Sequence, residues 1–381
     1  MPEDLFGLSR PLLPPLYTSA VYSFPDLDAL EAVYRGEESG FIYARDGHPN
    51  AEWLAAELAQ LENGRWAIVT ASGMAAIALI CAATLQAGDL VVASRRLYGR
   101  TLQLLTEELP RWHVRTQLVD LDDESAIVQA LAQRPKWFLV ETLSNPTLRV
   151  ADLSRLVQWC RQSDCRLIVD NTFATPALCR PLELGADLVV ESLTKMISGH
   201  SQVTLGAVIG MALDWHDRFR RSCSIWGWTG NAFDCWLAWQ GLQTLWIRMQ
   251  QASATAARLA DWLAQLPGIS RVIYPGRTDH PDHALARKLF REQYGNMLSV
   301  ELAGGRQAIN QFLRRQQVIV LAPSLGDVRT ICTHPDSTSH RYAPAEEKQR
   351  EGITPGLLRI SVGLEPLEVL QQAFLRGLGL A

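Results

Sequence analysis

The sequence of 381 residues predicts an α/β fold, in which a large domain has a mostly parallel sheet and a smaller α/β domain lies at the C-terminal end. Two observations predict this fold. Short apolar strands alternate with helical patterns between residues 50 and 195, and a long helical pattern without proline over 231–266 precedes a second group of strands. We therefore expect an N-terminal arm over 1–50, a large domain over 51–245 and a small domain over 246–381, linked by the helix at 231–266.

The arm is rich in proline and aromatic residues and has no clear periodicity. Pro11, Pro14, Pro15 and Pro25 break any long helix, which predicts an extended segment. An arm with this much apolar content needs a surface to lie on, and we expect a partner subunit to supply it. Tyr43 and Arg45 lie in the arm, and by themselves they fit a solvated loop equally well.

The alternating part of the chain begins with an amphipathic helix over 50–62. Strands are then predicted at 66–70, 90–94, 113–118, 137–141, 166–169 and 186–191, and helices at 75–85, 124–132 and 153–162. The second group has strands at 270–274, 298–302 and 357–362 and a helix at 306–313.

Polar residues follow several of these strands, as Ser72, Asn145, Asp170, Ser192 and Lys195 do. The carboxyl ends of parallel strands meet at one edge of a sheet, and ligands bind at that edge in open α/β folds. We therefore predict a ligand site there.

The turn Ser72-Gly73-Met74 stands between a strand and an alanine-rich helix. Free backbone N–H groups at a helix start favour phosphate, although many such turns bind nothing. Lys195 follows an apolar strand and precedes a glycine-containing polar turn, the setting of a lysine that forms a Schiff base through its neutral amine. A lysine solvated at a strand exit is the alternative interpretation.

Arg359 lies inside an apolar strand, and an arginine there is normally paired. A substrate carboxylate or a structural salt bridge would satisfy it.

The composition excludes several other functions. The net charge of −4 gives no electrostatic reason to expect nucleic acid or an anionic membrane. The seven cysteines are odd in number, lack a CxxC pair and indicate buried thiols in a reducing compartment. No signal peptide, membrane-spanning run or metal site is evident, so we expect a cytoplasmic protein.

The order and spacing of the motifs are more specific than any one of them. They include Tyr43-x-Arg45, Ser72-Gly73-Met74, Tyr98-Gly99, Ser144-Asn145-Pro146, Asp170-Asn171-Thr172, Ser192-Leu193-Thr194-Lys195 and Leu358-Arg359-x-Ser361-Val362-Gly363. In these residues the chain resembles the Cys/Met-metabolism, or trans-sulfuration, family of pyridoxal-phosphate enzymes. The resemblance covers essentially the whole chain and implies the fold-type I architecture, similar to aspartate aminotransferase.

The resemblance implies a role for each matched residue. Lys195 would bind pyridoxal phosphate covalently and then transfer protons, Asp170 would pair with the pyridinium nitrogen, and Tyr98 would stack on the ring. The other cofactor contacts that it implies come from Ser72, Gly73, Met74, Asn145, Thr172, Ser192 and Thr194. Arg359, with Ser324 and Leu325 nearby, would hold the substrate carboxylate. Tyr43 and Arg45 would reach the phosphate of the neighbouring subunit, in a dimer of dimers with shared active sites.

The family catalyses γ-elimination or γ-replacement on homoserine-derived or methionine-like amino acids, as in methionine γ-lyase, the O-acylhomoserine sulfhydrylases and cystathionine γ-synthase. Ile42 and Pro323 stand where cystathionine-handling relatives often have acidic residues, which favours a small or apolar γ-substituent. Arg100 either recognises a carboxylate such as a succinyl ester or points to solvent. His48 and Gln202 are further departures, at positions where asparagine and aspartate are commoner.

Three alternatives stay open. One is a β-lyase that acts on cystathionine or cysteine and releases pyruvate. Another is a specialised biosynthetic γ-replacement with a non-thiol nucleophile. The third is a binding or regulatory protein that has lost turnover.

Overall fold

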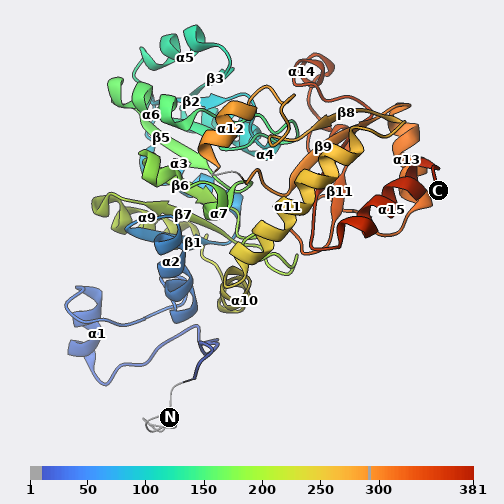
Figure 1. Ribbon diagram of the computed structural model, residues 1–381. Coiled ribbons are helices and arrows are strands. Elements are labelled where there is room, and N and C mark those ends of the chain that lie inside the picture. Colours follow the sequence, from blue (N-terminus) through green and yellow to red (C-terminus); the bar gives the residue numbers. More distant parts are fainter. Residues whose placement is uncertain (1–10, 291–292) are drawn as a thin grey trace.

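Two β-sheets organise the molecule in the computed structural model, which describes residues 11–290 and 293–381 (Figure 1). The first sheet has seven strands in the order β1-β7-β6-β5-β4-β2-β3. They are β1 (Trp66–Thr70), β2 (Leu90–Ser94), β3 (Arg115–Val119), β4 (Trp137–Glu141), β5 (Arg166–Asp170), β6 (Leu188–Glu191) and β7 (Gly206–Gly210). Strands β3, β2, β4, β5 and β6 are parallel neighbours, whereas β7 runs antiparallel to both β6 and β1. The predicted α/β fold with a mostly parallel sheet is therefore confirmed.

The second sheet has five strands in the order β10-β11-β12-β9-β8. They are β8 (Ile269–Ile273), β9 (Met297–Leu302), β10 (Val320–Leu321), β11 (Ile331–Thr333) and β12 (Leu357–Ser361). All neighbours are antiparallel except β10 and β11. Helices α11 (Leu245–Leu263), α13 (Gly305–Arg315) and α15 (Leu367–Leu378) pack on this sheet through a core of their own.

The helices cover both faces of the first sheet. On one face lie α2 (Pro49–Leu61), α5 (Glu124–Leu131), α6 (Leu153–Gln162), α7 (Thr175–Leu178), α8 (Pro181–Leu184), α10 (Ala232–Leu242) and α12 (His283–Leu289). On the other lie α3 (Gly73–Thr84), α9 (Leu213–Trp226) and the π-helical and 3-10 turns η1 (Leu104–Glu108) and η2 (Leu109–Trp112), which follow α4 (Gly99–Gln103). The C-terminal half adds α11 (Leu245–Leu263), α13 (Gly305–Arg315), η3 (Pro335–Ser337), α14 (Ala345–Arg350) and α15 (Leu367–Leu378).

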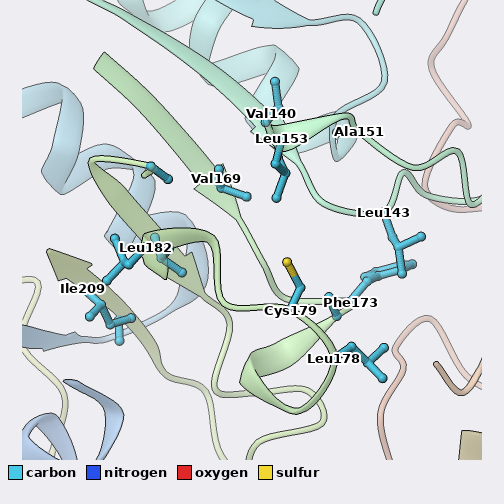
Figure 2. Packing of buried hydrophobic residues seen from close by; sticks show 14 of the residues in the cluster. Val140, Leu143, Ala151, Leu153, Val169, Phe173, Leu178, Cys179, Leu182 and Ile209 are labelled. Carbon is cyan, nitrogen blue, oxygen red and sulfur yellow. The ribbon is translucent and has the colours of Figure 1, made fainter. Parts of the chain in front are cut away.

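The strand sequences explain why two cores form. In β4, Phe138 and Val140 belong to one hydrophobic core, and Trp137 and Leu139 belong to the other. Successive side chains of a strand point to opposite faces, so a strand buried on both faces is apolar throughout. Figure 2 shows part of the first core, where Val140 packs among side chains from neighbouring strands and loops.

The prediction of a wholly extended arm is wrong, because the arm contains helix α1 (Leu27–Tyr34). Pro25 ends the preceding extended segment, and the Asp26 carboxylate then caps the helix by accepting a hydrogen bond of 2.8 Å from the Ala29 N–H. Figure 1 shows α1 lying apart from the two sheets. The first ten residues of the predicted arm lie outside the described residues.

The single helix predicted over 231–266 is also wrong, because α10 and α11 are separated by a turn at Gln243 and Thr244. The Gly241 carbonyl accepts hydrogen bonds from the side chains of Thr244, at 3.1 Å, and Arg248, at 2.7 Å. Side chains thus satisfy a carbonyl at the end of α10, which stabilises the break. Periodicity did not reveal it, because both helices have buried faces and no proline intervenes.

Arg248 is buried and holds this junction against the segment that follows Lys195. Its guanidinium donates to the carbonyls of Met196, at 2.6 Å, and Ile197, at 2.9 Å, besides that of Gly241. Burial lowers the pKa of Arg248 to about 10.

We predict that Arg248→Met lowers the free energy of unfolding by about 3 kcal/mol or more, because several buried carbonyls lose a charged donor. Urea unfolding of the apoprotein measures the effect. Arg258→Met is the control, since Arg258 is exposed on the same helix, and it should change stability by less than about 0.5 kcal/mol. Equal effects of the two substitutions would contradict the bridging role of Arg248.

Candidate active site

Lys195 lies in the turn after β6, at the edge of the sheet where the parallel strands end. Its Nζ donates a hydrogen bond of 3.0 Å to Ser324 Oγ, in the loop between β10 and β11. Burial, and to a smaller degree the charge of Arg359, lower the pKa of Lys195 to about 8. The amine is therefore partly neutral near neutral pH, as a nucleophile requires.

The loop that carries Ser324 packs directly on the lysine turn. Gly326 has a φ of +80°, and a Cβ there would collide with the backbone of Met196. Its N–H donates to Ser361 Oγ at 2.8 Å, which ties the loop to β12, and Leu325 beside it is buried. The glycine thus lets the second sheet approach the lysine closely.

Arg359 is the second cation of the site and lies at the centre of β12. It is 4% exposed, and its Nη atoms donate to Asn145 Oδ1 at 2.8 Å, the Ser324 carbonyl at 2.8 Å and Thr333 Oγ1 at 3.2 Å. Burial lowers its pKa to about 10. Its Nε is buried without a hydrogen-bond partner in the described part of the chain.

Within residues 11–290 and 293–381 Arg359 forms no ion pair. A buried guanidinium with neutral partners and a free N–H is suited to bind a carboxylate.

The turn predicted to bind phosphate lies against the end of β6. Ser72 caps α3, where its Oγ accepts a hydrogen bond of 3.0 Å from the Ala75 N–H. The N–H groups of Gly73 and Met74 belong to the first helical turn, where α3 itself offers no acceptor. A Cβ on Gly73 would lie 2.9 Å from the Cβ of Ser192, so only glycine leaves room between the two.

Two threonines of the prediction have different surroundings. Thr172 Oγ1 accepts a hydrogen bond of 2.9 Å from the Ser192 N–H and so joins β5 to the end of β6. Thr194 Oγ1 pairs with the backbone of Leu205 in both directions, at 3.1 Å each. The hydroxyl of Thr194 thus already has protein partners.

Two carboxyl groups lie side by side at the ends of β4 and β5. Glu141 is the register partner of Asp170, and it accepts a hydrogen bond of 2.5 Å from the Tyr98 N–H. Burial raises the pKa of both carboxyls, and the charge of Asp170 raises that of Glu141 further. A cation bound beside Asp170 would reverse part of this shift. Glu141 is not among the residues predicted for the site, and its only signal in the sequence is a polar side chain at the end of the predicted strand 137–141.

Three predicted residues are not brought to Lys195 within this chain. Tyr43 and Arg45 are exposed, and their side chains contact each other, with the guanidinium 5.0 Å from the ring centroid. Arg100 is exposed and donates to Gln103 Oε1 at 2.8 Å on its own helix. Tyr98, by contrast, stands at the start of α4 beside Glu141 with 42% of its surface exposed.

The two departures noted in the sequence have unequal roles. His48 is buried and caps α2, since its Nδ1 accepts a hydrogen bond of 3.2 Å from the Ala51 N–H and its Nε2 lies 2.9 Å from the Gly230 carbonyl. Gln202 is exposed. The histidine therefore supports the fold locally.

Comparison with known proteins decides the family. A family model described as Cys/Met metabolism PLP-dependent enzyme matches residues 9–379. The chain belongs to this family. It is 37% identical to the L-methionine gamma-lyase of Pseudomonas putida over 97% of this chain and 92% of that protein. It is 37% identical to the O-succinylhomoserine sulfhydrylase of Pseudomonas aeruginosa over 95% of this chain and 90% of that protein.

A solved structure supports the same assignment. The cystathionine gamma synthase of Xanthomonas oryzae pv. oryzae, in complex with cystathionine, aligns with a TM-score of 0.91 and 36% sequence identity over 96% of this chain and 92% of that chain. The protein is thus a trans-sulfuration enzyme that depends on pyridoxal phosphate. No helix among the described residues has both the length and the apolar composition to cross a membrane.

The residues of the site fit the cofactor. The lysine amine is desolvated, the start of α3 offers N–H donors with a glycine in close contact with Ser192, and a buried carboxyl stands at the end of β5. These three groups match an aldehyde, a phosphate and a pyridine nitrogen.

We predict that the rate at which apoprotein Lys195 reacts with pyridoxal phosphate rises with pH to a plateau, with a midpoint at about 8. Only the neutral amine attacks the aldehyde, so the rate increases as the ammonium loses its proton. Stopped-flow absorbance measures it, with Lys195→Ala as the blank. Arg359→Gln should move the midpoint to higher pH, because the arginine charge contributes to the lowered pKa. A midpoint above about 10 would show an ordinary lysine.

Proposed function

We propose that this enzyme catalyses γ-elimination or γ-replacement on a homoserine-derived or methionine-like amino acid whose γ-substituent is small or apolar. The observation that carries the proposal is Arg359, a buried guanidinium with no carboxylate partner among the described residues. Arg359 is linked to Lys195 through the loop that carries Ser324. Ser324 joins the two cations, because its Oγ accepts from Lys195 and its carbonyl accepts from Arg359. A substrate carboxylate on Arg359 therefore brings the α-carbon toward the lysine amine.

Each residue that we assign to the cofactor has a distinct task. The N–H groups of Gly73 and Met74 and the hydroxyl of Ser192 hold the phosphate, with Ser72, Thr172 and Thr194 shaping this pocket. Asp170 would hold a proton on the pyridine nitrogen, and Tyr98 and Asn145 would contact the ring. Pyridoxal phosphate, when bound, withdraws electrons from the bonds at the substrate α-carbon.

Lys195 performs the proton transfers. Its lowered pKa lets the neutral amine accept a proton from the α-carbon near neutral pH. The ammonium would then pass this proton on to the bound cofactor, and the amine, neutral again, would accept the proton of the β-carbon. Loss of the β-proton expels the γ-substituent. Tyr98 stands on the exposed side of the site, where it can exchange a proton with the leaving group.

The γ-substituent side of the pocket supports the proposed substrate class. Ile42 and Pro323 are apolar, so a second zwitterionic end would find no partner at these positions. The contact of Arg100 with Gln103 supplies no evidence for recognition of a distal carboxylate. Leu325, buried beside Ser324, completes the apolar lining that we propose.

We propose further that the active site is shared between subunits of a dimer of dimers. Tyr43 and Arg45 are exposed and form no hydrogen bond or ion pair with the residues around Lys195 in the described part of the chain. In a partner's site they supply an aromatic ring and a cation for the phosphate. The reducing cytoplasm is the proposed location, because all seven cysteines are buried.

The product distinguishes the possible reactions. We expect holoenzyme to release 2-oxobutanoate, or to form a new thioether when a small thiol is added, from methionine or O-acetylhomoserine in preference to cystathionine. Mass spectrometry of the products measures this, and Lys195→Ala should abolish turnover. Pyruvate from cystathionine as the main product would replace the proposal with a β-lyase, and cofactor binding without any keto acid or thioether would replace it with a binding protein.

Subunit complementation tests the shared site. Arg45→Ala and Lys195→Ala should each reduce activity by at least about tenfold, the former through loss of a phosphate contact. In mixed dimers, one site carries both substitutions and the other carries neither, so we expect mixing the variants to restore up to half of the wild-type activity per mixed dimer. Unchanged cofactor affinity in Arg45→Ala, or no recovery on mixing, would contradict a shared site.

A further inference from the structure

Two glutamates with no assigned role are buried behind the proposed cofactor site. Glu62, at the end of α2, and Glu191, the last residue of β6, are both 0% exposed. Asn171 links them, because its Nδ2 donates to Glu62 Oε1 at 3.0 Å and to Glu191 Oε1 at 3.1 Å. Asn171 directly follows Asp170 in the chain. The two glutamates therefore contact the residue next to the carboxylate that we assign to the pyridine nitrogen.

Asn171 is held firmly in this arrangement. The Thr142 hydroxyl donates to its Oδ1 at 2.7 Å, and its Nδ2 also lies 2.9 Å from the carbonyl of Cys179, a residue of the core shown in Figure 2. Its backbone N–H donates to the Val190 carbonyl at 2.9 Å. The side chain therefore has one orientation, and the two carboxyls bind to the same amide.

The oxygens of the pair indicate its protonation state. Glu62 Oε2 and Glu191 Oε2 are buried and have no N–H or hydroxyl donor among the described residues. Neither glutamate forms an ion pair with a lysine or arginine in the described part of the chain. Two ionised carboxylates sealed together without a cation would be very costly. A proton on one of them donates to the other and removes that cost.

The charged groups around the pair agree with this state. Arg180 acts weakly on Glu62 and is itself paired with Glu183 at 3.0 Å, while Asp170 acts on Glu191. Burial raises the pKa of Glu62 to about 7, and burial together with the charge of Glu62 raises the pKa of Glu191 well above its usual range.

We propose that Glu62 and Glu191 share one proton and act as positioning residues. The pair places a single fixed negative charge behind Asp170. It also anchors Asn171, which in turn orients Asp170. The charge favours retention of the proton between Asp170 and the pyridine nitrogen, because a nearby anion makes loss of a proton more costly. This role rests on the function proposed for Asp170. The shared proton itself does not depend on it.

Three variants distinguish the effect of the shared proton from the effect of the negative charge of the glutamate pair. Glu62→Gln and Glu191→Gln each leave one carboxylate with an amide donor beside it, so the net charge of −1 is kept and the shared proton is lost. The double variant, Glu62→Gln with Glu191→Gln, has no charge. Glu368→Gln is the control, since Glu368 is exposed on α15.

Infrared spectroscopy of the apoprotein at pH 7.5 tests the shared proton. The difference between wild-type and Glu191→Gln spectra should contain the carbonyl stretch of a buried, protonated carboxylic acid, and the difference for Glu62→Gln should contain the same band. The control difference should lack it. If neither single-variant difference contains the band, the pair holds no proton and the proposal is wrong.

Cofactor affinity tests the effect of the charge. The single variants should bind pyridoxal phosphate within about threefold of the wild type, and the double variant should bind it about tenfold more weakly, as expected when one charge near a bound cation is removed. Equal affinity of the double and single variants would overturn the positioning role.

Asp170→Asn identifies the cause of such a result. If Asp170→Asn also binds pyridoxal phosphate like the wild type, the role of Asp170 in the proposed function fails together with the positioning role. If Asp170→Asn binds it weakly, only the positioning role fails.

Discussion

The contact between the lysine turn and the loop around Gly326 is the constraint on which the rest of the site depends. The turn belongs to the first sheet and the loop to the second, and the absence of a side chain at Gly326 lets their backbones meet. The Val328 N–H then donates to the Gly199 carbonyl at 2.8 Å, which adds a direct hydrogen bond between the two segments. Because this contact exists, the Ser324 hydroxyl accepts a hydrogen bond from Lys195, and the Ser324 carbonyl accepts one from the Arg359 guanidinium.

Burial shifts the pKa of four ionisable groups in the candidate site. It lowers the pKa of Lys195 and Arg359 and raises that of Asp170 and Glu141. Each group is therefore closer to neutrality than it would be in water, and each gains when an opposite charge arrives. These shifts suit a ligand that brings a cation to the carboxyls and an anion to Arg359.

The elements that the sequence predicted well are those with a strong local pattern. Strands β1, β2 and β4 have the predicted bounds, and α6 does too, because an apolar run or a 3.6-residue period is visible within ten residues. The break between α10 and α11 was missed because its cause is the side chain of Arg248 and the carbonyls that it reaches at Met196 and Ile197. Helix α1 was missed because prolines nearby obscured its cap.

The sequence by itself determined the alternation of strands and helices, the motifs of the family and the place of Lys195 after an apolar strand, since all of these depend on residues close together in the chain. Only the tertiary structure decided which groups share a site. Arg359 and its partner Asn145 are 214 residues apart, and Glu62 and Asn171 are 109 apart. The burial, pairing and protonation of a side chain depend on such distant neighbours, because residues far away in the chain pack against it and exclude solvent from it. Local sequence patterns do not predict that packing.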